Sequence, residues 1–133
     1  MVEDPEREPA MFASDNGIGG FHNDVLNAFP TDDESALKLV EEIKNRAKGC
    51  ISSQNYPGAI SLYSKAIEIC PTESVASKAI LYSNRSLCHF SMSSSDLAIE
   101  DAGHSIVADP SYLKVQYLTS LLSHFTDLSI LFG

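Results

Sequence analysis

The sequence predicts an all-α protein built from stacked pairs of helices, and three observations support this. The first is a spacing that recurs after 39 residues: Ala59, Tyr63, Ala66 and Pro71 return as Ala98, Ala102, Ser105 and Pro110. The second is the step of four and then three residues inside each set, which places its members on one face of a helix. The third is the closing proline, which ends a helix. We therefore expect two copies of one helical unit.

The residues before the repeats have a different composition. Residues 1–30 mix acids, prolines and glycines without any sustained period, which predicts a disordered acidic tail. An alternative applies to residues 21–29 (FHNDVLNAF), where an amphipathic turn that docks on the repeats is also compatible with the pattern. The ordered, helical domain is expected over residues 31–126.

The first unit should contain two helices. Thr31 and Glu34 have the spacing of a capping box, which predicts a helix from there to about Ser52. Asn55 and Pro57 mark a turn and the start of the next helix, which ends near Ile69.

The second unit should also contain two helices. The first of them is expected over residues 74–90, and residues 91–96 form a turn whose serines and Asp96 supply the caps of the next helix. That helix should end near Val107, because Asp109 and Pro110 follow it.

A last helix is expected from Ser111, followed by an apolar tail over residues 127–133. Residues 117–132 are markedly apolar, but His124 and Asp127 interrupt them and the run is shorter than the roughly 20 residues of a membrane span, so no anchor is predicted. Because the chain stops at Gly133, this helix lacks a second helix to cover it. We expect either a shortened version of a longer protein or self-association or partner binding through the exposed apolar face.

Composition excludes several classes of function. The net charge is −9, with 18 acidic and 9 basic side chains, which argues against binding to nucleic acid. The three cysteines have no disulfide or metal spacing, and the N-terminus has no secretory signal, so a cytoplasmic or also nuclear location is expected. The four histidines are not spaced as metal ligands and no nucleophile motif is present, so we expect neither a catalytic site nor a metal nor a cofactor.

The spacing of small residues and prolines resembles the tetratricopeptide repeat, a helix-turn-helix unit of about 34 residues. Counting back from each proline gives repeats at residues 40–73 and 79–112 and a partial third repeat from residue 113, with residues 74–78 inserted in the connection. The resemblance implies a helix-turn-helix solenoid of two repeats plus one additional helix. It also implies that the first helix of each pair lines a concave groove.

Basic residues gather on the helices that this resemblance assigns to the groove. Seven of the nine basic residues fall there: Lys38, Lys44, Arg46, Lys48, Lys78, Arg85 and Lys114. An acidic peptide is the natural ligand of such a groove, since charge-assisted hydrogen bonds are strengthened by partial desolvation. The alternative is that these side chains are ordinary solvated positions on helices.

Some repeats of this family hold the acidic C-terminal tails of the Hsp70 and Hsp90 chaperones in a two-carboxylate clamp. The resemblance implies that Lys44, Asn84 and Lys114 match three of its five positions. Lys48 stands where the clamp has an asparagine, and Leu118 stands where it has an arginine, which removes a multi-donor partner. Arg46 and Arg85 are two further groove candidates.

Two functions follow from the resemblance. The first is a non-enzymatic co-chaperone adaptor that binds acidic Hsp70 or Hsp90 tails in its groove. The alternative is a scaffold without a working clamp that binds a partner helix or self-associates. In this alternative the chain is a truncated isoform of a longer protein. A targeting module of a larger enzyme is a third class of function, but no residue of the sequence supports it.

Overall fold

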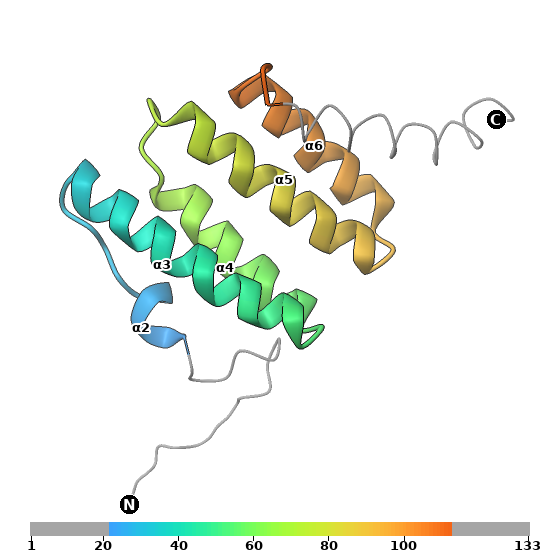
Figure 1. Ribbon diagram of the computed structural model, residues 1–133, viewed down its shortest axis with the longest axis horizontal. Coiled ribbons are helices and arrows are strands. Elements are labelled where there is room, and N and C mark those ends of the chain that lie inside the picture. The colour runs from blue at the N-terminus through green and yellow to red at the C-terminus, as the bar shows by residue number, and fades with distance from the viewer. Residues whose placement is uncertain (1–21, 113–133) are drawn as a thin grey trace, which may run out of the picture. The chain divides into compact units, whose positions relative to one another are not determined.

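The computed structural model describes residues 22–112, which contain five α-helices and no strand (Figure 1). The predicted all-α, helix-turn-helix fold is confirmed. The chain divides into two compact units, Met1–Ile69 and Cys70–Gly133, and the described part of each contains one pair of packed helices. The expected last helix, the partial third repeat and the apolar tail over residues 127–133 lie outside the described residues.

The first unit pairs α3 (Asp33–Ser52) with α4 (Tyr56–Ile69), which run antiparallel side by side (Figure 1). The two helices bury an apolar stripe: Ala36, Val40, Ile43, Ala47 and Cys50 on α3, and Ala59, Leu62, Tyr63 and Ala66 on α4. The small residues of the repeated pattern are all fully buried, which lets the two backbones approach closely. Tyr63 fills the space beside them.

The second unit pairs α5 (Val75–Ser91) with α6 (Ser95–Ala108) in the same antiparallel manner (Figure 1). Ala98 and Ala102 are buried, and they pack against three partly buried hydrophobic side chains: Phe90, Ile106 and Tyr112. The five residues that we placed in the connection mostly extend α5, which begins at Val75.

The turns inside the two pairs have the same backbone structure. Gln54 and Ser93, 39 residues apart, both have φ of 63°. The residue after each donates a backbone hydrogen bond to the preceding helix. The Asn55 amide donates to the Cys50 carbonyl at 2.7 Å, and the Ser94 amide donates to the His89 carbonyl at 2.8 Å. This pattern is the Schellman motif, which satisfies carbonyls at the end of a helix. The sequence repeat is therefore also a repeat of backbone conformation.

Two predicted helix caps are wrong. The N-cap of α3 is Asp32, one residue after Thr31, and its carboxylate accepts from the Ser35 amide at 2.7 Å. A carboxylate makes a charge-assisted bond to the free amides, which holds the pKa of Asp32 below its usual value. At α6 the N-cap is Ser94, but its hydroxyl makes no capping hydrogen bond.

Residues 22–30 fold onto the first unit, so the predicted disordered tail does not extend to residue 30. They include the short helix α2 (Asn23–Leu26), which lies against α3 (Figure 1). Val25 is buried, as the docking alternative for residues 21–29 expects. We call residues 22–30 the N-terminal strap.

Candidate functional site

The clamp candidates are distributed over both units. Lys44 and Lys48 lie one turn apart on α3, so they share one stripe of that helix. Asn84 lies on α5, where it is partly buried. Lys114 and Leu118 lie outside the described residues.

Lys44 has an acidic neighbour on its own helix. Its Nζ lies 3.2 Å from Glu41 Oε2, and it is the donor of a hydrogen bond to that oxygen. Only 20% of the Lys44 side chain is exposed, against 64% of the Glu41 side chain. Lys48 is exposed. The most buried cation of this stripe is therefore already paired, whereas the cation one turn later faces solvent.

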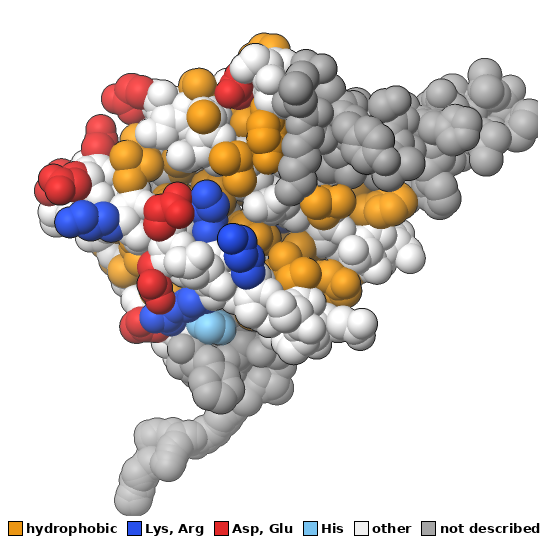
Figure 2. All heavy atoms as spheres, viewed as in Figure 1, with side chains coloured by type: hydrophobic (Ala, Val, Ile, Leu, Met, Phe, Trp, Pro, Cys, Tyr) orange, Lys and Arg blue, Asp and Glu red, His pale blue; other side chains and the backbone are white. Residues whose placement is uncertain are grey.

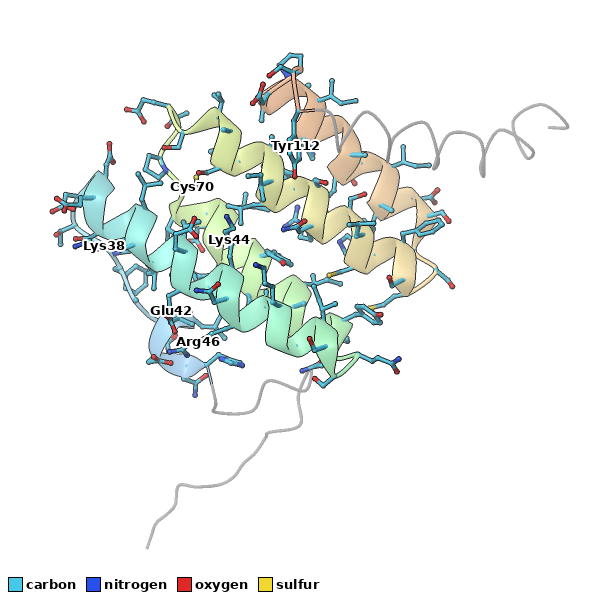
Figure 3. The ribbon with its side chains drawn as sticks, viewed as in Figure 1. Lys38, Glu42, Lys44, Arg46, Cys70 and Tyr112 are labelled. Atoms are coloured by element: carbon cyan, nitrogen blue, oxygen red, sulfur yellow. The ribbon has the colours of Figure 1, made fainter. Side chains whose placement is uncertain are left out.

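Arg46 is held by the strap and by its own helix. Its guanidinium donates two hydrogen bonds to the Asp24 carboxylate at 2.8 and 2.9 Å, and a third to Glu42 at 2.8 Å. These bonds raise the pKa of Arg46 and hold the pKa of Asp24 below its usual value. Arg46 and Glu42 lie on the side of α3 that faces α2, whereas Lys44 lies on the opposite side (Figure 3).

Other contacts attach the strap to both helices of the first unit. His22 Nε2 lies 4.0 Å from Cys50 Sγ, and the Lys65 ammonium sits 4.5 Å above the centre of the Phe29 ring. Lys65 is only 7% exposed whereas Phe29 is 79% exposed, so the lysine of this cation–π contact is shielded but the ring still faces water. Burial also raises the pKa of the Cys50 thiol, which makes it a poor nucleophile.

Arg85 is held by the second helix of its own pair. Its guanidinium donates to both oxygens of Asp101 on α6, at 2.7 and 2.8 Å. The Asp101 side chain is 4% exposed and that of Arg85 21%. The ion pair raises the pKa of Arg85, and the guanidinium also lies 5.6 Å from the centre of the Tyr82 ring.

Both arginines are engaged by carboxylates of their own unit, and ligand binding by either of them in a groove stays a prediction. Both guanidinium groups form forked bonds with carboxylates of the same unit, and these bonds hold secondary structure elements together. Sequence reasoning missed this because Asp24 and Asp101 lie 22 and 16 residues from the arginines that they bind.

The surface around α3 is mixed in charge rather than uniformly basic. Figure 2 shows acidic and basic side chains interspersed on this side of the first unit. Lys38 also has an acidic neighbour, Glu34, at 3.7 Å. Intramolecular carboxylates thus offset several of the cations that we expected to attract an acidic ligand.

Two other kinds of site are absent from the described part of the chain. Residues 22–112 contain no group of three histidine, cysteine or acidic side chains arranged to hold a metal ion. None of the helices in the same range is long and apolar enough to cross a membrane.

No protein-family model matches this chain. Individual proteins do, and the chain is similar to small glutamine-rich tetratricopeptide repeat-containing protein 2 of Saccharomyces cerevisiae, with 34% identity over 85 residues. That match covers 64% of this chain and 23% of the yeast protein. It is also similar to Hsp70-Hsp90 organizing protein 3 of Arabidopsis thaliana, with 33% identity over 76 residues, 57% of this chain and 13% of that protein.

A third relative is an enzyme. Human serine/threonine-protein phosphatase 5 is 38% identical over 84 residues, which are 63% of this chain and 16% of the phosphatase. The match lies in the repeat region of that protein, so it gives no phosphatase activity to this chain. The matched region spans less than a quarter of the length of each of these three relatives.

The relatives and the fold agree on the nature of the repeated unit. The two described helix pairs bury the small residues of the 39-residue pattern, and their turns share one backbone geometry. The matched proteins include tetratricopeptide co-chaperones, which supports a role in protein–protein interaction. The fold and these relatives support a tetratricopeptide-type repeat in this chain, which resembles co-chaperone members of that family.

Proposed function

We propose that this chain is an adaptor that binds the acidic C-terminal peptide of an Hsp70 or Hsp90 chaperone. The observation that carries the proposal is the stripe of Lys44 and Lys48, one turn apart on α3, of which Lys44 lies on the side of the helix away from α2 (Figure 3). Asn84 and Lys114 complete the set that the family resemblance implies. The Arabidopsis relative is named as an organizer of these two chaperones, which also supports the proposal.

Each side chain has a distinct chemical task in this proposal. A lysine ammonium donates up to three hydrogen bonds, so Lys44 and Lys114 bind carboxylate oxygens of the peptide. The amide of Asn84 donates to a further oxygen. Lys48 carries a charge where the clamp has a neutral amide, which favours a peptide with two carboxylates close together. Because Leu118 cannot donate, we expect weak, salt-sensitive binding.

A titration with two forms of one peptide tests the proposal. The peptide is acidic and ends in aspartate, with either a free or an amidated C-terminus, and its fluorescence anisotropy is followed on adding the full chain. We expect the free form to bind and amidation to abolish binding. Lys44→Ala and Lys114→Ala should each weaken binding about tenfold or more, since a hydrogen bond to a charged group contributes roughly 1.5–3 kcal/mol.

Lys38→Ala is the matched control, because it removes one exposed lysine from the same helix. It should change the dissociation constant far less than Lys44→Ala does. Equal loss in both variants would show that only the overall charge matters, and equal binding of both peptides would contradict the clamp.

The second candidate function is a repeat scaffold without a working clamp. The pairing of Lys44 with Glu41 and the leucine at position 118 favour it. In that case neither peptide should bind, and the chain should act through a partner helix or a second copy. Light scattering during gel filtration tests self-association, and a monomer at high concentration contradicts it.

We also propose that the protein acts in the cytoplasm or the nucleus. All three cysteines lie within the described residues, where they are buried thiols rather than disulfides, as a reducing compartment favours. Imaging of a fluorescent fusion tests this location, and accumulation in a secretory organelle would contradict it.

A further inference from the structure

We propose that Glu41 competes with the ligand for Lys44 and thereby lowers the affinity of this chain for acidic peptides. The inference rests on the proposed function, because it assigns a regulator to the same lysine. Glu41 is a positioning residue in this proposal: it acts on the ligand only through Lys44.

The geometry of the pair supports competition. Glu41 lies one turn before Lys44 on α3, and the two charged atoms are 3.2 Å apart. The Lys44 side chain is mostly buried, whereas Glu41 is mostly exposed, so the lysine has fewer alternative positions than the glutamate. A ligand carboxylate that approaches Lys44 meets a like charge beside the ammonium. It must share that ammonium with Glu41 or displace it.

The neighbouring lysine shows what is special about this pair. Lys48 has Asn45 and Lys44 at the positions three and four residues before it, so its own helix offers it no such acid. Glu41 therefore offsets one of the two positive charges of the stripe and leaves the other. The effect on an acidic ligand is specific to the Lys44 end of the stripe.

Glu41→Gln tests the inference, because it removes the charge while keeping the size of the side chain. Ion pairs between neighbouring turns of a surface helix contribute little, so we expect the dissociation constant for the free-acid peptide to fall about two- to fivefold. Glu34→Gln is the matched control, since Glu34 pairs with Lys38 on the same helix at 3.7 Å. Glu34→Gln should improve the affinity for the peptide by less than half as much as Glu41→Gln does.

A double-mutant cycle shows whether Glu41 acts through Lys44. In the Lys44→Ala background, Glu41→Gln should improve binding no more than Glu34→Gln does. The gain from Glu41→Gln in the otherwise unchanged chain should also shrink at high salt. Thermal unfolding of all variants checks that the helix pair is intact.

The outcomes separate this inference from the proposed function. If the unchanged chain binds the peptide and Glu41→Gln binds it equally or more weakly, Glu41 does not compete and the inference is overturned alone. If Glu41→Gln lowers the dissociation constant just as much in the Lys44→Ala background, the inference is also overturned. The improvement would then come from the change in overall charge and not from Lys44. If neither the unchanged chain nor Glu41→Gln binds the peptide, both proposals fail together.

Discussion

The two helix pairs place an arginine at the same position and give it different partners. Arg46 and Arg85 lie 39 residues apart, each on the first helix of its pair. Arg85 binds Asp101 on the second helix of its own pair, whereas Arg46 binds Asp24 in the strap. The residue 39 positions before Asp101 is Leu62, which is buried and cannot accept a hydrogen bond.

This difference extends along the interface of each pair. The first pair buries Leu62, Tyr63 and Ala66 of α4 in the positions where α6 has Asp101, Ala102 and Ser105. In the second pair the hydroxyls of Ser86 and Ser105 each donate to a carbonyl of the opposite helix at 2.6 Å. At these positions the first copy is therefore held by apolar packing, whereas the second combines apolar packing with polar side-chain contacts. Polar contacts are more sensitive to the loss of one partner than to the loss of both.

The largest expected effect comes from breaking the buried ion pair of the second unit. Asp101→Ala leaves the Arg85 guanidinium, 21% exposed, without its carboxylate. We expect a loss of about 2 to 3 kcal/mol in the free energy of unfolding, at the low end for a buried pair because water still reaches the arginine. Urea unfolding followed by circular dichroism measures it.

The control replaces both members of the pair. Arg85→Met combined with Asp101→Leu gives the second pair an apolar contact like that of the first, and it should return stability to within about 1 kcal/mol of the unchanged chain. If the double variant is as unstable as Asp101→Ala, the ion pair does not act as a compensated unit.

A smaller effect is expected at the starts of α4 and α6. Asn55 accepts from the Gly58 amide at 3.0 Å, and a Cβ at Gly58 would meet the Asn55 side chain. The residue 39 positions after Gly58 is Leu97, and the N-cap Ser94 there makes no capping bond. Asn55→Ala should therefore destabilise the chain by about 1 kcal/mol.

Ser94→Ala is the matched control, and thermal unfolding compares the two variants. It should change the free energy of unfolding by less than about 0.5 kcal/mol. Equal losses in both variants would show that Ser94 caps α6 in solution.

The helices were predictable from the sequence because their signals are local. The spacing of small residues, the prolines and the turn residues lie within a few positions of the structure that they specify, and the four helices predicted within the described residues all occur. The N-cap of α3 was missed by one residue because three polar residues in succession, Thr31, Asp32 and Asp33, can each cap a helix.

The ion pairs around the candidate site were not predictable in the same way. Asp24 and Asp101, which bind Arg46 and Arg85, come from other elements, and nothing in the repeat pattern specifies them. The pairs within α3 do have a local signal, because Glu41 lies three residues before Lys44 and Glu34 and Glu42 lie four residues before Lys38 and Arg46. Sequence reasoning could therefore place cations on α3 and α5 but could not tell which of them are already neutralised.

The smallest expected effect concerns the pH dependence of the second helix pair. His89 lies 3.6 Å from Asp101, yet burial lowers its pKa below the usual 6.5, an effect that Asp101 opposes and Arg85 reinforces. The unfolded chain therefore binds a proton at this histidine more readily than the folded chain does. The stability contributed by neutral His89 is fully present above pH 6.5 and is lost as the pH falls from there through the folded pKa.

We expect the unfolding midpoint of the unchanged chain to fall more than that of His89→Gln between about pH 8 and pH 5.5, a range that spans histidine titration. His104→Gln is the control, because His104 is half exposed and also lies near an acid, Glu100, at 3.9 Å. It should leave the pH dependence of the unchanged chain in place. If His89→Gln retains the full dependence, protonation of His89 is not what weakens the second pair in mild acid. The interface of the second pair would then differ from that of the first in its ion pair and its serine hydrogen bonds, and not in its response to pH.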